Sequence, residues 1–375
     1  MAGYIQEFFL TTRRNGRCNT CYPKSQFARN KMTLRSALIA TALAVVHACK
    51  VSADPLTVEI AKDLFTDAQL VSDPIEVDCT LSGGAETRCI QLTFKPEPAT
   101  YEAGPWCPKS VDDGPESSGI WFYEGEIVDA DGAFFTRLSA LYDDEGWQVF
   151  DPETGQIFYT ATKEACELAA RPNVAEEYQN HCVQCLLEFV DEGHTVTYAI
   201  PVEPIAADRP NDLRGIGAGV AFNGIRIDEP APVKAILGAY TIAAFDDCAG
   251  HVNPAVGYHY HAVTDCLEGV EVHTHEDGQT HSHNANNVDG DPIGLALDGH
   301  FIFPHLNADG SEPEGLDTCF GHSSEELGYH YHAGVPGMNQ NLGCLTAQVG
   351  CSAGEAGETC NAAATIRRGP PPPRD

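Results

Sequence analysis

The chain has 375 residues, enough for two ordinary domains. Its 54 acidic side chains outnumber 22 Lys and Arg, which gives a formal net charge of −32. Such a field repels phosphate backbones and anionic lipid headgroups, so we expect neither nucleic acid nor a membrane surface as a partner. It favours cations or simple solubility, and it leaves any protein partner unknown.

Residues 29–53 have the layout of a secretory signal peptide. A basic segment (29–35) precedes an apolar run (36–46), and Val51-Ser52-Ala53 forms a small-x-small cleavage site. The apolar run is too short to span a membrane. We predict a signal peptide over residues 32–53, with residues 1–31 a gene-model extension or an unusual leader. The mature protein is then secreted or periplasmic.

Removal of residues 1–53 changes both the charge and the cysteine content. That segment holds 8 of 22 basic and 1 of 54 acidic residues, which leaves 14 and 53, or −39. It also holds 3 of 15 cysteines, which leaves 12, six on each side of residue 205. Even numbers behind a signal peptide predict disulfides in an oxidising compartment.

Strand patterns dominate residues 54–205. Short β-branched or aromatic runs lie between Gly, Pro and Asp clusters, at residues 56–60, 89–94, 120–123, 147–150, 156–159 and 194–202. The best helix candidate is 162–170, with Thr162 as its cap and Pro172 beyond its end. We predict a mainly β, disulfide-stabilised protein, β-sandwich-like or barrel-like, with few short helices.

Two cysteine patterns in this region favour structural disulfides. Cys79 and Cys89 lie in strand-like runs that flank the turn-like segment 82–85, so we expect them to pair. Cys182-Val183-Gln184-Cys185 is a C-x-x-C, which in a βαβ setting suggests thiol exchange. No such setting is visible, and structural pairing with other cysteines is the favoured interpretation.

Prolines and acidic residues at 201–210 indicate a boundary. We therefore predict a β-rich N-terminal domain over 54–205 and a second domain over 206–351. Residues 352–375, which end in a proline run, are expected to be a disordered tail.

The second domain contains one pattern twice, 71 positions apart: D-x-C-x-G-H-x5-G-Y-H-Y-H-A begins at Asp246 and again at Asp317. Upstream, G-φ-A-φ-[ND]-G occurs at Gly219 and Gly294, at an offset of 75. This repeat predicts two packed copies of one β unit. A pseudo-two-fold pair would bring the equivalent motifs to a shared interface. By symmetry, Cys248–Cys266 and Cys319–Cys344 are expected to be equivalent disulfides.

The two Gly-Tyr-His-Tyr-His segments, the Ile293–Phe303 stretch and Leu316-Asp317 before Cys319 resemble the YHYH-domain proteins. The resemblance covers roughly residues 212–351. This chain differs in having His300 where the family has an aromatic residue, and in lacking Phe-Pro-Tyr after the second motif. The resemblance supplies a domain assignment and implies little about mechanism.

The Tyr-His-Tyr-His segment suits a strand that carries metal ligands. With a period of two, alternate side chains share a face, so two imidazoles can bind one ion and a third can approach from a neighbouring strand. Three histidines leave a coordination position open. The predicted sets are His251, His259, His261 and His322, His330, His332. They form either two sites or one composite site, with Asp246 and Asp317 as orienting groups. The alternative is a hydrogen-bonded Tyr–His core without metal.

Other candidates are weaker. Residues 273–283 hold a second histidine cluster in a polar, loop-like segment, in which the family resemblance gives His283 the best claim to a metal. Asp298, in a Leu-Asp-Gly turn, is a candidate ligand or general base, or only a turn residue. The Asp- and Asn-rich segments 289–291 and 307–310 lack the spacing of a calcium loop and are predicted to be turns.

These observations predict a secreted YHYH-domain protein that binds a divalent transition metal, copper or zinc, through histidine clusters. A metal-dependent hydrolase or a copper oxidoreductase is one alternative, and would need an open site and a base such as Asp298. A structural module with a Tyr–His core is the other.

Overall fold

The structure is a computed structural model that describes residues 55–65, 68–171, 173–268, 273–274, 280–281, 292–307, 309–324, 327–353 and 359–366. All of these lie in one compact unit, residues 50–375. The predicted leader, residues 1–53, lies outside the described residues. The domain boundary predicted near residue 205 stays a prediction. Strands from both sides of it share sheets.

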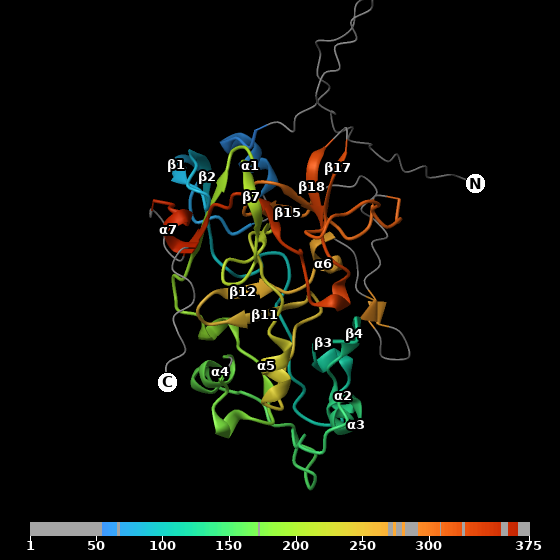
Figure 1. The fold of residues 1–375 in the computed structure, drawn as a ribbon. Coiled ribbons are helices and arrows are strands. Elements are labelled where there is room, and N and C mark those ends of the chain that lie inside the picture. The colour runs from blue at the N-terminus through green and yellow to red at the C-terminus, as the bar shows by residue number, and fades with distance from the viewer. Residues whose placement is uncertain are drawn as a thin grey trace, which may run out of the picture. The chain divides into compact units, whose positions relative to one another are not determined.

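The protein is mainly β, and its largest sheet has eight strands (Figure 1). In spatial order they are β11 (Gly250–Asn253), β12 (Gly257–Tyr260), β9 (Arg226–Ile227), β8 (Gly219–Ala221), β15 (Gly294–Ala296), β16 (Phe301–Phe303), β18 (Gly328–His332) and β17 (Gly321–Ser324). The β12–β9 and β16–β18 pairs are parallel and the others antiparallel. Among the described strands the order is linear, so this sheet is open.

The centre of this sheet is the antiparallel pair of β8 and β15. Val220 lies opposite Leu295, and strand order outward from this pair is the same on both sides. The backbones pack so closely that a Cβ on Gly219 would lie 2.1 Å from the Leu295 carbonyl oxygen. The expectation that the two histidine motifs meet at the repeat interface is therefore wrong. The glycine strands form that interface, and the motifs lie at opposite edges of the sheet.

A second sheet joins distant parts of the chain. It contains β1 (Ile75–Thr80), β2 (Glu86–Phe94), β6 (Val196–Pro201) and β20 (Cys351–Ala353). Four two-stranded ladders complete the described strands: β3 (Ile120–Tyr123) with β4 (Glu126–Asp129), β5 (Cys182–Val183) with β10 (Ile242–Ala243), β7 (Ala206–Asn211) with β19 (Leu345–Ala347), and β13 (His273–Thr274) with β14 (Thr280–His281).

The helices are short. They are α1 (Val58–Leu64), α2 (Gly132–Thr136), α3 (Leu138–Leu141), α4 (Lys163–Ala169), α5 (Val233–Gly238), α6 (Asp265–Glu268) and α7 (Ala362–Ile366), with 3-10 turns η1 (Pro115–Ser117), η2 (Glu176–Tyr178), η3 (Leu187–Phe189) and η4 (Pro336–Met338). No helix among the described residues is long and apolar enough to cross a bilayer.

Of the helix and strands predicted from the sequence, some are present in the structure and others are not. The helix at 162–170 is confirmed as α4, and the Thr162 side chain accepts a hydrogen bond from the Ala165 amide as expected of its cap. The strand predicted at 56–60 is wrong: Thr57 caps α1 by accepting from the Ile60 amide. The runs at 147–150 and 156–159 form isolated bridges, not ladders.

Six disulfides cross-link the described chain: Cys79–Cys89, Cys107–Cys182, Cys166–Cys185, Cys248–Cys266, Cys319–Cys344 and Cys351–Cys360. The first, fourth and fifth are the pairs predicted from spacing and symmetry. The C-x-x-C cysteines pair elsewhere, which agrees with their structural interpretation. The prediction of a disordered tail from residue 352 is wrong in part, because β20, Cys360 and α7 are ordered.

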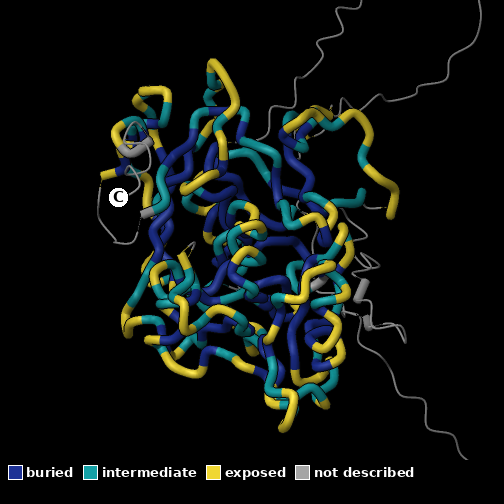
Figure 2. Tube along the Cα trace, turned by 60° about the horizontal axis from the view of Figure 1, so that its bottom comes forward, coloured by how far each residue is buried: buried dark blue, intermediate teal, exposed yellow. Residues whose placement is uncertain are grey.

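Buried segments pass through the interior, and exposed ones lie in the peripheral loops (Figure 2). The main core cluster packs residues of the N-terminal region against the repeats. Trp121 from β3 stacks on Phe245, with ring centroids 5.9 Å apart. Phe245 in turn contacts His251, at 4.9 Å between centroids. The core therefore supports one histidine motif directly.

Candidate metal centres

Each motif folds as a hairpin that gathers three imidazoles. In the first, β11 pairs with β12 in the register that puts His251 opposite His259, and His261 follows two residues later. In the second, β17 and β18 put His322 opposite His330. Cross-strand partners and residues at i and i+2 share one face of a sheet. The two predicted histidine sets are therefore brought together, each within its own hairpin.

The residues before each hairpin form a tight turn around an aspartate. The Asp246 carboxylate accepts hydrogen bonds from the Cys248 and Gly250 amides and, at 2.8 Å, from the Tyr258 hydroxyl. Asp317 accepts the equivalent set in the second motif, with Tyr329 at 2.9 Å. The prediction that these aspartates orient the imidazoles is wrong: they fix the turn and the tyrosine on the other face of the strand.

The glycine before the first histidine is required by packing. A Cβ on Gly250 would lie 2.1 Å from the Tyr258 ring and hydroxyl, and one on Gly321 would lie 2.2 Å from the Tyr329 hydroxyl. The tyrosine therefore crosses directly over the glycine to reach the aspartate. This contact explains why Asp, Gly and Tyr recur at fixed positions in both copies.

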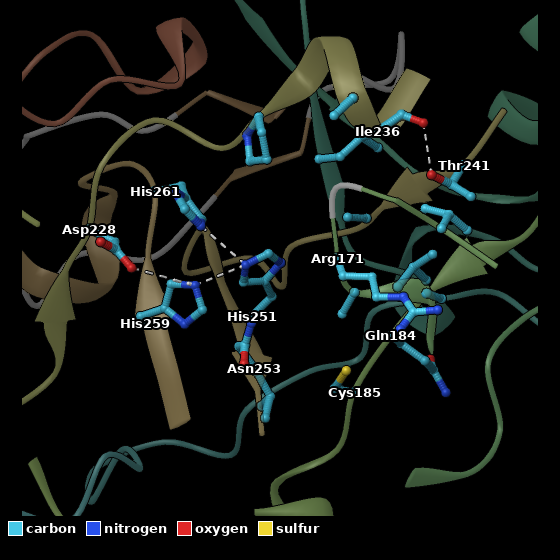
Figure 3. Close-up of a pocket in the computed structure, with 18 of the residues that line it drawn as sticks. Arg171, Gln184, Cys185, Asp228, Ile236, Thr241, His251, Asn253, His259 and His261 are labelled. Atoms are coloured by element: carbon cyan, nitrogen blue, oxygen red, sulfur yellow. Dashed lines mark hydrogen bonds and ion pairs between the residues drawn. The ribbon is translucent and has the colours of Figure 1, made fainter. Parts of the chain in front are cut away.

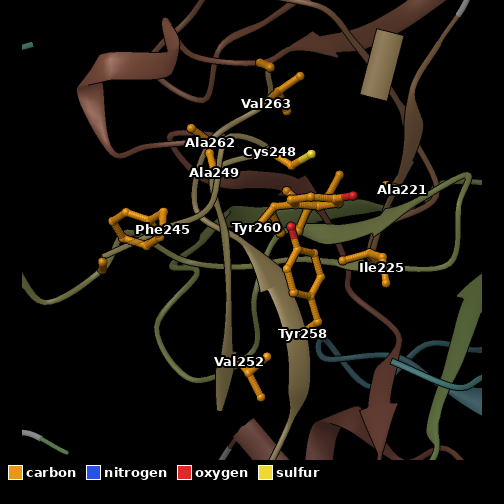
Figure 4. Close-up of a cluster of buried hydrophobic side chains, with 14 of the residues drawn as sticks. Ala221, Ile225, Phe245, Cys248, Ala249, Val252, Tyr258, Tyr260, Ala262 and Val263 are labelled. Atoms are coloured by element: carbon orange, nitrogen blue, oxygen red, sulfur yellow. The ribbon is translucent and has the colours of Figure 1, made fainter. Parts of the chain in front are cut away.

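The second tyrosine of each motif is also hydrogen-bonded. The Tyr260 hydroxyl accepts from Asn223 at 2.8 Å, and the Tyr331 hydroxyl donates to Asp298 at 2.7 Å. Tyr258 and Tyr260 lie among buried side chains (Figure 4). Strand alternation puts them on the face opposite the histidines. Asp298 is thus hydrogen-bonded to a tyrosine, on the side of the strand away from the histidines. The equivalent residue in the first repeat is Asn223, whose amide cannot act as a base. The structure does not bring Asp298 to the imidazoles.

The imidazole nitrogens converge in both centres. In the first, Nε2 of His251 lies 3.0 Å from Nε2 of His259 and 3.1 Å from Nε2 of His261 (Figure 3). In the second, Nε2 of His322 lies 3.0 Å from Nε2 of His330. Within each triad a potential ligand atom of every member lies within 4.8 Å of the others.

Backbone carbonyls hold the opposite ring nitrogens. His259 Nδ1 lies 3.1 Å from the Gly257 oxygen and His261 Nδ1 lies 2.6 Å from the Glu229 oxygen. In the second centre the acceptors are Gly328, Pro304 and Glu314, for His330, His332 and His322. A carbonyl can only accept, so in these five rings Nδ1 carries the hydrogen and the Nε2 lone pair of the neutral ring points into the centre.

In the second centre the Nε2 lone pairs of His322 and His330 face each other at 3.0 Å, and they repel unless a cation lies between them. A metal ion fits the spacing in both centres. With metal–nitrogen bonds of about 2.0–2.1 Å, two ligands lie about 2.9 Å apart at a right angle and about 3.4 Å apart at a tetrahedral angle. The observed 3.0–3.1 Å falls inside this range. The donor sets therefore suit a transition metal that accepts imidazole.

Protonation of the rings is disfavoured. Burial is the main cause: it lowers the pKa of His261 to about 3 and that of His332 to about 4, and neighbouring imidazoles add to the effect. Burial also lowers the pKa of His251, His259 and His330. Neutral imidazoles are the form that binds metal.

The two centres differ in one flanking residue. Asp228 follows β9, and its Oδ2 lies 4.0 Å from Nε2 of His259. Its other oxygen pairs with Arg226 at 2.9 Å, and both side chains are largely buried. Burial alone would raise the pKa of Asp228, but Arg226, and then His259, outweigh it and lower the pKa to about 2. At the 75-residue offset the second repeat has Phe303 in this place.

A cavity of about 240 Å³ adjoins the first centre (Figure 3). The three histidines and Asp228 form one side, and α5, the end of α4 and residues 183–185 form the rest. Neither Asp228 nor this cavity was predicted from the sequence. A signal for Asp228 was present, since Arg226-Ile227-Asp228 aligns with Phe301-Ile302-Phe303 and the repeats diverge there in charge.

The remaining histidine candidates lie in the segment 273–283. His283 and His275 lie outside the described residues. His273 and His281 are paired across the antiparallel β13–β14 ladder, so these two histidines, which were predicted to lie in a loop, lie in strands.

The described chain is thus a disulfide-linked, mainly β protein with two three-histidine clusters at opposite edges of one sheet. The family model described as "YHYH protein" matches residues 197–312, so the chain contains a YHYH domain. The match begins in β6 and ends before the second histidine motif. No curated protein matches the chain. No solved structure matches it either.

Proposed function

We propose that this protein is exported and binds two divalent transition-metal ions, one in each three-histidine cluster. The observation that carries the proposal is the convergence of Nε2 atoms at 3.0–3.1 Å in both centres, with backbone carbonyls on the Nδ1 side of five of the six rings. Copper and zinc both suit imidazole ligands. Three protein ligands leave a position on each ion for another group.

A purely structural Tyr–His core is the less favoured function. The tyrosines already fix each hairpin through Asp246, Asp317, Asn223 and Asp298. His322 and His330 add no hydrogen bond across the second centre, because each Nδ1 donates to a carbonyl and the two Nε2 lone pairs then face each other. A buried cluster of that kind costs stability unless a cation occupies it.

Export is supported by the six disulfides, which persist in oxidising compartments. The charge–apolar–small pattern of residues 29–53 supports the same destination.

Elemental analysis of protein purified without chelators tests the proposal. We expect copper or zinc at a molar ratio near two per chain, and little metal after all six cluster histidines are replaced by alanine. Replacement of His181 and His194, which lie outside the clusters, is the control and should leave the metal content unchanged. A metal-free wild-type protein that also fails to take up added Zn²⁺ or Cu²⁺ would contradict the proposal.

A further inference from the structure

The two centres share ligand geometry but not surroundings, and the difference begins with Asp228. Phe303 occupies the equivalent place in the second centre, with its ring centroid 4.9 Å from that of His330 and 5.9 Å from that of His332. A phenyl ring covers those imidazoles and offers no hydrogen bond. In the first centre this place holds a carboxylate, and the phenyl ring that contacts the imidazoles, Phe245, comes from another position, 4.9 Å from His251 and 5.4 Å from His261 between centroids.

Asp228 lies next to the ligand cluster without belonging to it. Its nearest oxygen is 4.0 Å from Nε2 of His259, and it is not among the three residues whose ligand atoms all lie within 4.8 Å of one another. Its other oxygen is taken by Arg226 and by the Glu229 amide. This position suits a hydrogen-bond acceptor for a group bound on the metal better than it suits a fourth metal ligand.

The cavity supplies room for such a group at the first centre. Its lining is mostly apolar and includes Val183, Pro232, Ala235 and Ile236. Its volume of about 240 Å³ lies below the usual range of about 300–1,000 Å³ for drug-sized ligands, so its occupant is small. Asp228 and Glu229 both line it, which opposes anions despite the exposed Arg171.

We infer that the first centre, and not the second, binds an exchangeable small uncharged ligand in the cavity. The ligand combines an apolar body with a donor atom for the metal and a nearby N–H or O–H that donates to Asp228, as azoles and alcohols do. The second centre holds its metal beneath Phe303 and plays a structural part. This inference rests on the proposed metal binding.

The test uses the full mature chain loaded with Co²⁺, whose d–d absorption reports changes in coordination, and imidazole as the probe. Bound Co²⁺ is measured after gel filtration at each imidazole concentration. We expect two bound ions, of which one responds saturably to imidazole. The response should survive replacement of His322 and His330 by alanine and disappear on replacement of His259 and His261.

Two further variants test the cavity and the carboxylate separately. Ala235→Trp fills the cavity without touching a ligand and should weaken imidazole binding at least tenfold, whereas Lys234→Trp, exposed on the same helix, should not. The double change Arg226→Phe with Asp228→Phe copies Phe301 and Phe303 of the second repeat, and leaves no unpaired buried charge. It should retain two Co²⁺ ions and lose the response.

The outcomes separate the two proposals. Failure to bind Co²⁺, Zn²⁺ and Cu²⁺ contradicts the proposed metal binding and, with it, this inference. Two bound ions with no imidazole response, with a response from both, or with a response that persists in Ala235→Trp contradict this inference alone. If the double phenylalanine variant does not fold, as judged by near-ultraviolet circular dichroism, the Ala235→Trp and Lys234→Trp pair decides the question.

Discussion

Within β12 tyrosines and histidines alternate, so one face of the strand carries hydrogen-bonded phenols and the other carries imidazoles. The Tyr258 hydroxyl contacts both oxygens of Asp246 at 2.8 Å, while His259 and His261 converge on His251. The buried tyrosines thus hold the strand in the rotation that aims the imidazoles at one point. The tyrosine face of the strand therefore fixes its orientation, and the histidine face supplies the candidate metal ligands.

The contact between Gly250 and the Tyr258 ring gives a residue-scale prediction. Gly250→Ala would place a methyl group 2.1 Å from that ring, so the hairpin must shift. We expect a loss of about 1–3 kcal/mol in the free energy of unfolding, measured by urea denaturation. Gly238→Ala, at the exposed end of α5 with nothing within 4 Å of its added Cβ, is the control and should be neutral or stabilising. Equal effects of the two changes would contradict the packing argument.

The lowered histidine pKa values predict how the metal-free protein responds to acid. Folded His261 and His332 have a pKa of about 3 and 4, whereas an unfolded histidine titrates near 6.5. Below about pH 6.5 the unfolded chain therefore binds protons that the folded chain does not, and the free energy of unfolding falls. Asp246 acts in the opposite sense, because burial raises its pKa to about 6.

Since five cluster histidines have a lowered pKa, we expect their effect to exceed that of Asp246. The urea midpoint of metal-free protein should decrease between pH 7 and pH 5, and bound metal should reduce this decrease. A midpoint that stays constant or rises over this interval would show that the imidazoles are not held neutral.

At the scale of elements, the sheet is organised around the β8–β15 pair. Five strand steps separate β12 from β18, which at about 4.8 Å per step puts the hairpins about 24 Å apart. A single ion cannot bridge that distance. The topology therefore favours two separate centres over one composite site.

The equivalence of Asn223 and Asp298 gives an element-scale prediction. Each holds the second tyrosine of its motif, and Asp298 also accepts from the Ala347 amide. Asp298→Asn should therefore cost about 1 kcal/mol of stability through a weaker hydrogen bond and leave the metal content unchanged. Loss of one metal ion from a variant that still folds would indicate that Asp298 is a metal ligand.

The parts predicted from sequence are those set by short-range rules. Alternation in Tyr-His-Tyr-His determines which side chains share a face, and the spacing around residues 82–85 determines the Cys79–Cys89 pair. The central β8–β15 pairing, by contrast, joins strands 75 positions apart, and several registers suit the same pattern. The cavity brings residues 169–185 against residues 228–261. No local pattern specifies that contact.

At the scale of the whole molecule, disulfides join segments that lie far apart in the sequence as well as neighbouring strands. Cys107–Cys182 spans 75 positions, and closing a long loop restricts the unfolded chain most. The six pairs account for all twelve cysteines from residue 54 onward.

We therefore expect the mature protein to have no free thiol. Alkylation of the native protein under denaturing, non-reducing conditions should label none of the twelve cysteines, and intact mass should show twelve labels after reduction. Several labelled cysteines before reduction would contradict folding in an oxidising compartment.

The central claim is that each hairpin binds its own metal ion, and counting metal in one double variant tests it most directly. His259 and His261 are replaced together by alanine, the second hairpin is left intact, and bound metal per folded chain is measured by mass spectrometry. We predict two ions in the wild type and one in the variant. No metal in the wild type, or two ions in the variant, would contradict the claim, and loss of both ions would show that the hairpins share a single site.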